Sequence, residues 1–275
     1  MQARTLLFPV LATCCALALV GSAAVADEVD QDDQAADLAK TIQNPLASLI
    51  SLPLQFNYNK GVGAYDRTFF NLSVQPVIPF PGEKWNIISQ TIIPVNSVPM
   101  GEFDSVFGIG DINFSLFWSP AKPSPLTWGV GPAITLPSAS NPEVLGSGKL
   151  SIGPTAVLFY ATGKWTMGFV TSNVWSVAGD SDREDVSFFL AQYFLNYNFG
   201  KGWAVGTAPI VTANWKAPSG DQWTVPFGLQ ISKLMRFGPR PVNLLIGYYT
   251  NTEHPDGGPD SQARFQMNLL FPTKQ

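Results

Sequence analysis

Apolar and polar residues alternate along most of this chain, and the pattern is clearest near its C-terminal end. From residue 264 to residue 271, the odd-numbered positions are apolar and the even-numbered positions up to 268 are polar. In an extended strand, successive side chains point to opposite faces, so this segment would have one apolar and one polar face. Such a strand suits the wall of a transmembrane β-barrel, where one face meets lipid and the other meets a polar interior.

Eleven further segments have a comparable pattern, and turn-forming residues separate them. The strands are expected at residues 51–60, 68–80, 84–95, 105–119, 125–137, 148–162, 163–177, 184–199, 201–215, 221–236, 240–251 and 261–271. Connections after even-numbered strands are mostly short, whereas those after odd-numbered strands are mostly longer and polar. This alternation is typical of periplasmic turns and extracellular loops. The pattern therefore predicts an all-β, up-and-down antiparallel transmembrane barrel of about 12 strands over residues 51–275.

A soluble β-sandwich or lipocalin-like barrel would also have regularly spaced strands, but its outer surface would be polar. The eight tryptophans lie near predicted strand ends, where they would form girdles at the two membrane interfaces. This arrangement favours the transmembrane barrel. Prolines within strands cannot donate to the hydrogen-bond ladder, and the Gly-Pro pairs at 131–132 and 153–154 suggest bulges or bends.

The N-terminus has the organisation of a secretory signal peptide over residues 1–26. Arg4 supplies a positive charge, residues 6–20 are apolar, and Ala24-Val25-Ala26 offers a cleavage site before Asp27. Both cysteines lie in this segment, so the mature chain would contain no thiol. Residues 27–50 are predicted to comprise an acidic lead and a short amphipathic helix that Pro45 divides. This helix would pack at the barrel rim or partly inside the barrel. Alternatively, it would act as a plug that gates a pore.

Composition excludes several functions. A net charge of −4 without a basic face argues against a nucleic-acid partner. No spacing of His, Cys or carboxylates predicts a metal site, and no cofactor motif is recognisable. The one histidine, His254, lies in a predicted loop, which makes a membrane-embedded hydrolase an unfavoured alternative. We therefore predict no catalytic residues.

Strand alternation identifies polar side chains that would point into the barrel. This candidate pore lining comprises Asn71, Gln75, Asp111, Asn113, Gln192, Asn196, Gln230, Arg264, Gln266 and Asn268. Amides predominate, so the lining would have weak charge selectivity and would suit small uncharged or mixed polar-aromatic solutes. Alternatively, the same residues fill a narrow barrel with hydrogen bonds and leave no passage.

Many short motifs occur in an order that resembles a family of bacterial outer-membrane channels or transporters. They include Gln43-Asn44-Pro45-Leu46-Ala47, Gln75-Pro76-Val77-Ile78-Pro79, Gly108-Ile109-Gly110-Asp111-Ile112, Trp128-Gly129-Val130-Gly131-Pro132, Trp223-Thr224-Val225-Pro226 and Pro255-Asp256-Gly257-Gly258-Pro259. The family is that of the phenol-degradation (meta-cleavage) pathway type, often mislabelled neuromedin U. The resemblance implies an outer-membrane barrel with a transport role, and it specifies neither catalytic residues nor a solute.

We therefore expect an outer-membrane channel that passively passes small, including hydrophobic or aromatic, solutes. A non-conducting barrel that has a structural role or binds partners through its loops remains an alternative. The expected partners are outer-membrane lipid, a small-molecule solute and the insertion machinery, which would recognise Phe271 and Phe265 in the last strand as an assembly signal. The sequence does not indicate an oligomeric state.

Overall fold

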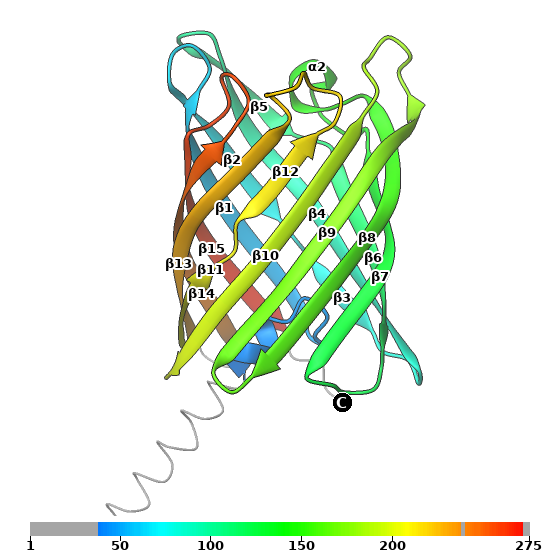
Figure 1. The fold of residues 1–275 in the computed structure, drawn as a ribbon, viewed down its shortest axis with the longest axis vertical. Helices are drawn as coiled ribbons and strands as arrows, with labels where there is room; N and C mark the ends of the chain where they lie inside the picture. Colours follow the sequence, from blue (N-terminus) through cyan, green and yellow to red (C-terminus); the bar gives the residue numbers. More distant parts are fainter. Residues whose placement is uncertain (1–37, 238–239, 272–275) are drawn as a thin grey trace, which may run out of the picture.

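Antiparallel strands pair edge to edge until the sheet closes on itself as a barrel (Figure 1). The computed structural model describes residues 38–237 and 240–271. The predicted signal peptide and the acidic lead lie outside these residues. The strands are β1 (Ile50–Val62), β2 (Arg67–Val74), β3 (Val77–Phe80), β4 (Trp85–Met100), β5 (Asp104–Ile109), β6 (Ile112–Pro120), β7 (Leu126–Leu136), β8 (Lys149–Thr162), β9 (Trp165–Gly179), β10 (Ser187–Gly200), β11 (Trp203–Thr207), β12 (Ile210–Asn214), β13 (Trp223–Phe237), β14 (Arg240–Glu253) and β15 (Ser261–Phe271).

These elements form twelve barrel strands, because three of the barrel strands are each interrupted and so divided into two elements. The interrupted strands are β2 with β3, β5 with β6, and β11 with β12, and they correspond to predicted strands 68–80, 105–119 and 201–215. The first and last strands pair along their length, from Ile50 opposite Phe271 to Lys60 opposite Ser261. Pairing of β9 with β10 completes the closed wall. The prediction of an antiparallel barrel with 12 strands is confirmed.

Each interruption lies at a residue that disturbs the ladder. Pro76 separates β2 from β3, and Pro209 separates β11 from β12. Proline has no N–H to donate, so a ladder commonly breaks where it occurs. Gly110 and Asp111 separate β5 from β6; the Gly110 N–H still donates to its ladder partner, the Pro94 carbonyl (2.8 Å), and the register with β4 then shifts by one residue. At the break between β11 and β12, the Ala208 N–H and carbonyl bond to side chains of β14 and β15.

The bulges suggested for the two Gly-Pro pairs are not present. Pro132 lies directly opposite Pro154, and β7 and β8 keep one register throughout. A Cβ added at Gly131 would lie 1.8 Å from the Leu116 carbonyl oxygen, and one at Gly153 would lie 1.7 Å from that of Asn173. At each Gly-Pro pair, the proline therefore supplies no N–H to the hydrogen-bond ladder, and the glycine allows the backbone of a neighbouring strand to approach closely.

The outer face of the barrel is apolar and bears aromatic rings near both ends of the strands. All eight tryptophans are exposed. Trp85, Trp118, Trp128, Trp165 and Trp203 lie at one end of the barrel, and Trp175, Trp215 and Trp223 lie at the other. Neighbouring rings make edge contacts, with centroids of Trp215 and Trp223 5.2 Å apart. This arrangement confirms the predicted girdles and excludes a soluble barrel, whose outer surface would be polar.

The two ends of the barrel differ in the length of their connections. We call the end with connections 81–84, 121–125, 163–164 and 201–202 the turn end, and it is the lower end in Figure 1. We call the other the loop end; its longest connection, residues 137–148, contains the short helix α2 (Pro142–Leu145). The Asn141 side chain caps this helix by accepting a hydrogen bond from the Val144 N–H (3.2 Å). Most loop-end connections are longer than those at the turn end, as predicted, but the predicted long loops near 61–67 and 96–104 are short, because β4 extends to Met100 and connections 63–66 and 101–103 are tight.

Residues 38–49 precede β1 and lie inside the turn end of the barrel (Figure 1). Only residues 38–42 of this segment are helical, and residues 43–49 form turns and bends. The prediction of a second helical piece after Pro45 is therefore wrong, because the chain bends to reach the barrel wall. No helix among the described residues is long and apolar enough to cross a membrane.

Candidate functional site in the barrel lumen

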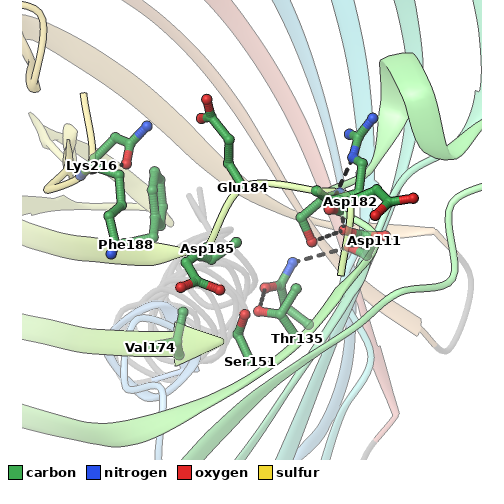
Figure 2. A pocket seen from close by; sticks show the side chains of 14 residues that line it. Asp111, Thr135, Ser151, Val174, Asp182, Glu184, Asp185, Phe188 and Lys216 are labelled. Carbon is green, nitrogen blue, oxygen red and sulfur yellow. Dashed lines mark hydrogen bonds between the residues drawn. The ribbon is translucent and has the colours of Figure 1, made fainter. Parts of the chain in front are cut away.

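A cavity of about 660 Å³ occupies the loop end of the lumen (Figure 2). Polar side chains from β6, β7, β8 and β12, together with Val174 of β9 and Phe188 of β10, form its walls. Charged residues from connection 180–186 lie at its mouth. The lining residues are Asp111, Asn113, Thr135, Ser147, Ser151, Val174, Asp182, Arg183, Glu184, Asp185, Val186, Phe188, Asn214 and Lys216. The cavity therefore combines hydroxyl, amide and charged groups with three apolar side chains.

Asp111 anchors the longest connection to the wall of this cavity. Its Oδ1 accepts hydrogen bonds from the backbone N–H groups of Ser138 (3.1 Å) and Ala139 (3.2 Å). Its Oδ2 accepts bonds from the N–H (2.7 Å) and the hydroxyl (2.8 Å) of Ser147. Hydrogen bonds to an ionised acceptor are stronger than those between neutral groups. Asp111 thus faces inward, as predicted, but its carboxylate binds the protein's own loop.

An ion pair lies beside this anchor. Lys149 Nζ is 3.4 Å from Asp185 Oδ1, and the Lys149 side chain is only 10% exposed. The Ser176 hydroxyl, which donates a hydrogen bond to Asp185 (3.2 Å), and then Lys149 lower the pKa of the Asp185 carboxyl below its ordinary value. Arg183 donates to the carbonyl groups of Pro142 and Gly146. The charged groups of connection 180–186 therefore link it to β8 and to connection 137–148.

Halfway along the lumen, Arg264 of β15 is almost completely buried, with an exposed fraction of 4%. Its Nη1 donates to the Ala208 carbonyl (2.9 Å), its Nη2 to Gln262 Oε1 (2.8 Å), and its Nε to Asn57 Oδ1 (3.3 Å). The guanidinium also lies 4.7 Å from the centre of the Tyr249 ring. The charge is thus held by neutral acceptors and an aromatic face.

Tyr249 connects Arg264 to the other polar side chains at this level. Its hydroxyl donates to Gln230 Oε1 (2.8 Å) and accepts from the Ala208 N–H (3.3 Å). Gln230 in turn donates to Asn196 Oδ1 (3.3 Å). Ala208 lies in the break between β11 and β12, so Arg264 and Tyr249 satisfy the backbone groups that the interruption releases. We call Arg264, Tyr249, Gln230, Asn57 and Gln262 the mid-lumen cluster.

Amide side chains extend this cluster across three neighbouring strands. Asn57 of β1 donates to Asn71 Oδ1 of β2 (3.0 Å), and Asn71 donates to Asn96 Oδ1 of β4 (2.8 Å). Gln55 and Ser73 add bonds to the same row (3.2 and 2.8 Å). Each polar group here finds a partner without water, so this wall is polar and ordered.

The opposite part of the lumen is apolar. Phe159 of β8 and Phe194 of β10 pack together with ring centroids 6.2 Å apart, and Ala208 belongs to the same buried cluster. Ile88, Phe117 and Val157 belong to a second buried cluster. The lumen therefore has one hydrogen-bonding wall and one aromatic and aliphatic wall, which meet at Ala208.

Residues 38–49 fill the turn end of the lumen between these walls. Leu46 packs into the cluster of Ile88, Phe117 and Val157, and Ala39 packs against Leu234 and Leu270. Gln43 donates to Asn198 Oδ1 (2.9 Å) and accepts a hydrogen bond from the Thr166 hydroxyl. We call residues 38–49 the inner segment. The alternative in which it lies partly inside the barrel is confirmed, whereas gating remains a hypothesis.

A second, smaller cavity of about 150 Å³ lies between the inner segment and the wall. Gln266 and Asn268 of β15 contribute to its lining, as do Gln90 of β4 and Gln43 and Asn44 of the inner segment. The Asn268 Oδ1 atom is buried and accepts no hydrogen bond among the described residues. The turn end thus retains a small polar space beside the inner segment.

The structure places nearly all of the predicted lining residues inside the barrel, but at three different levels. Asp111 and Asn113 lie at the loop-end cavity, and Gln266 and Asn268 lie at the turn-end cavity. The others make lumen hydrogen bonds near the middle; they are Asn71, Gln192, Asn196, Gln230 and Arg264. Gln75 lies in the break between β2 and β3, where its N–H donates to the Pro53 carbonyl (2.9 Å). None of these contacts tests whether solutes pass through the lumen, so solute passage stays a prediction.

Sequence reasoning missed Tyr249, Leu46 and the Ala208 backbone. Tyr248 is exposed and Tyr249 is fully buried, although the two residues are identical neighbours in the sequence. Consistent alternation from Asn251 would have assigned Tyr249 to the inner face. No local signal predicts that Ala208 supplies both a donor and an acceptor, because its partners come from β14 and β15.

His254 has the contacts of a loop residue. Its Nδ1 lies 3.0 Å from the Pro255 carbonyl oxygen, and its Nε2 lies 3.4 Å from Asp260 Oδ1. Within the described ranges, His254 makes no hydrogen bond to a serine, and no group of His, Cys and carboxylate side chains could hold a metal ion. A hydrolytic site requires a nucleophile within hydrogen-bond reach of its base, so this geometry gives no support to the hydrolase alternative.

A closed antiparallel barrel with an apolar outer face, aromatic rings at both ends and a polar lumen defines a transmembrane β-barrel of the outer-membrane type. Residues 50–259 match the family described as "Putative MetA-pathway of phenol degradation". This match covers most of the chain, so the protein belongs to that family. The predicted resemblance is confirmed. No curated protein sequence gives a significant match.

Solved structures with the same fold come from outer-membrane proteins. The COG4313 outer membrane channel from Pseudomonas putida F1 is 15% identical and has a TM-score of 0.61 over 82% of this chain and 96% of that one. The NanC porin is 11% identical, with a TM-score of 0.51 over 81% of this chain and 100% of that one. Outer membrane phospholipase A from Escherichia coli is 12% identical over 85% of this chain and 98% of that one. Its TM-score of 0.45 is too low to support a hydrolase.

Proposed function

We propose that this protein is a channel of the bacterial outer membrane through which small solutes, including hydrophobic or aromatic ones, pass passively. The observation that carries the proposal is that no strand among residues 38–237 and 240–271 crosses either end of the lumen. A cavity of about 660 Å³ occupies the loop end, and the inner segment fills the turn end. Because this segment is not part of the sheet, it can move without breaking the barrel wall.

The chemistry of the lumen supports small solutes of mixed polarity. A 12-stranded barrel is narrower than the 16-stranded porins, which contain a wide aqueous channel. The lumen contains the hydrogen-bonded side chains of the mid-lumen cluster on one side and the packed rings of Phe159 and Phe194 on the other. Ion and solute selectivity in channels follows from such lining groups at close range.

The same proposal assigns an orientation in the membrane. Removal of residues 1–26 as a signal peptide would place the mature N-terminus at Asp27, and the turn end would face the periplasm. The loop end, with connections such as 137–148, would face the outside. Terminal sequencing of protein from isolated outer membranes checks this, and a mature chain that begins elsewhere would contradict it.

Planar-bilayer recordings of refolded mature protein test the channel function. We expect stepwise ionic conductance, together with uptake of small solutes such as phenol in liposome swelling. Folding would be verified independently by heat-modifiable migration on gels. Folded protein that neither conducts nor passes solutes would favour the alternative of a non-conducting barrel with a structural or partner-binding role.

Outer-membrane lipid and the insertion machinery are the partners that this function requires. Phe265 is 38% exposed on the outer face, and the Arg240 guanidinium lies 5.7 Å from the centre of the Phe271 ring. We expect Phe271→Ala to lower the folded, heat-modifiable fraction, with a smaller loss for Phe265→Ala, because an aromatic at the end of the last strand would be read during insertion. Normal insertion of Phe271→Asp would contradict this assignment.

A further inference from the structure

We propose that the outer surface of the barrel, at its turn end, carries a binding site for the headgroup of an anionic phospholipid. The site consists of Lys233 and Arg240, each of which lies over an aromatic ring at the level of the turn-end girdle. We call these two cations and their rings, Trp203 and Phe271, the cation–aromatic site. This inference goes beyond the proposed channel function, because lipid binding is measured without conductance.

Both cations lie on the face of the barrel that meets lipid. Lys233 of β13 is paired directly opposite Trp203 of β11, and paired residues of antiparallel strands share one face of the sheet. Trp203 is 39% exposed on the outer face, and Lys233 Nζ lies 5.1 Å from the centre of its ring. The Arg240 guanidinium of β14 lies 5.7 Å from the centre of the Phe271 ring, in the outward apolar row of β15. The two cations are therefore at the membrane interface, outside the lumen.

Neither charge is neutralised by a carboxylate. Lys233 Nζ donates a hydrogen bond to the Lys201 carbonyl, which is a neutral acceptor. Within residues 38–237 and 240–271, no acidic group forms an ion pair with Lys233 or Arg240. An aromatic face attracts a cation but leaves its positive charge in place. Ammonium and guanidinium groups both bind phosphate oxygens, so the two side chains keep the capacity to hold a phosphate.

The charges around the barrel favour an anion at the turn end and disfavour it at the loop end. Among the described residues, Glu83 is the one acidic side chain at the turn end, and β15 and β1 lie between its connection, 81–84, and β14. Acidic residues predominate at the loop end, for example Asp104, Asp182 and Glu184. Basic side chains near a membrane surface attract anionic lipids. The turn end is therefore the end that suits an anionic headgroup.

Apolar rings beside the two cations favour a lipid over a free phosphate ion. Phe199 is stacked on Trp203 with ring centroids 6.4 Å apart, and Phe237, which is paired opposite Arg240, is 60% exposed. Aromatic rings at a membrane interface lie where headgroups meet acyl chains. A phospholipid could therefore place its phosphate toward the cations and its acyl chains against the rings. In the proposed orientation, this lipid belongs to the leaflet that faces the periplasm.

Native mass spectrometry of the mature protein, released from detergent, tests the site. The protein is titrated with dioleoylphosphatidylglycerol and with dioleoylphosphatidylcholine, which has the same acyl chains but no net charge. We expect wild type to bind the anionic lipid about tenfold or more tightly, since each basic residue near a membrane surface strengthens this attraction about fivefold. Lys233→Gln combined with Arg240→Gln should remove most of this preference, whereas Lys233→Arg combined with Arg240→Lys should retain it.

A second double variant is the matched control. Lys84→Gln combined with Lys122→Gln removes two positive charges from turn-end connections 81–84 and 121–125, and it should leave the preference unchanged. Trp203→Leu keeps the charge of Lys233 but removes the ring beneath it, so we expect a smaller loss than in the double variant that lacks both cations. Heat-modifiable migration on gels verifies folding of each variant.

Several results would overturn this inference. Equal binding of the two lipids by folded wild type would do so, as would an equal loss in the control variant, which would show attraction by the whole turn end. Complete displacement of the lipid by millimolar inorganic phosphate would indicate a site for free anions. A preference that appears only in a chain that begins at residue 38 would show that the acidic lead occupies the site instead.

The channel function and the lipid site can fail separately. A folded protein that binds phosphatidylglycerol at this site but does not conduct would overturn the channel function alone. A protein that conducts without any lipid preference would overturn the site alone. If the variant that lacks both cations fails to fold, Lys233→Gln and Arg240→Gln are measured singly, and the comparison of the two lipids on wild type still decides whether an anionic headgroup is preferred.

Discussion

The two ends of the lumen are closed by different means. At the loop end, connection 137–148 is held against the wall by hydrogen bonds to the Asp111 carboxylate, and a cavity of about 660 Å³ remains beneath it. At the turn end, the inner segment is held mainly by apolar packing of Leu46 and Ala39, and the remaining space is about 150 Å³. One end is a polar vestibule, and the other is filled by chain.

Under the proposed channel function, this difference would allow one barrel to be both stable and permeable. Hydrogen bonds to a carboxylate are directional, so Asp111 fixes its loop in one position beside the opening. Apolar packing is less directional, so an inner segment held mainly by it can shift more readily than a loop fixed by a carboxylate. We therefore expect the turn end to limit the flow of solutes and the loop end to admit them.

Removal of the inner segment should have the largest effect. A protein that lacks residues 38–49 would lose the packing of Leu46 and Ala39 in the turn end. We expect conductance to rise several-fold, because the wall itself leaves that end open. Single-channel recordings measure this change, and gel mobility confirms folding. An unchanged conductance would show that the constriction lies at the mid-lumen cluster instead.

Truncation of one side chain in the same segment should give an intermediate effect. Leu46→Ala would leave a cavity among Ile88, Phe117 and Val157. Such substitutions in packed cores cost about 2–5 kcal/mol. We expect a lower denaturation midpoint and a moderate rise in conductance. Leu46→Met, which conserves volume, is the control and should change both quantities less.

Loss of the Asp111 carboxylate should loosen the loop end. Asp111→Ala would leave four donors in connection 137–148 without their acceptor. We expect faster proteolysis within that connection and a stability loss of about 1–3 kcal/mol, the cost of removing one partner from buried hydrogen bonds. Asp104→Asn, at the loop-end start of β5, is the control. Equal protease resistance of Asp111→Ala and wild type would show that other contacts hold the loop.

The ion pair at the loop end should give the smallest effect. The pKa of Asp185 is lowered from 3.8, first by the Ser176 hydroxyl and then by Lys149. A carboxyl with a lowered folded pKa contributes its stability above its unfolded pKa and loses it as the pH falls through the folded value. Acidification from pH 7 to about 5 should therefore leave connection 180–186 unchanged. Opening should begin only below about 3.8. Limited proteolysis with an acid-active protease measures this, and Asp185→Asn should abolish the dependence.

Much of the barrel wall could be predicted, because alternation and turn residues act over a few neighbouring positions of the sequence. Alternation in segment 261–271 specifies which residues meet lipid, and the same rule placed Arg264, Gln266 and Asn268 inside the barrel. The alternation of short and long connections identified the two ends. The interruptions were not predicted as such, although Pro76 and Pro209 mark two of them, because a ladder break depends on the neighbouring strand as well as on proline.

By itself, the sequence determined the number of strands, their outward faces and the family, since a period of two and the turn residues act over a few neighbouring positions. Only the tertiary structure decided what the inward residues do. Asp111 binds a loop, Arg264 binds the Ala208 carbonyl, and Leu46 enters a cluster formed by three different strands. These partners lie far apart along the chain and meet only because the sheet closes. Barrel closure, rather than any local pattern, therefore set the chemistry of the lumen.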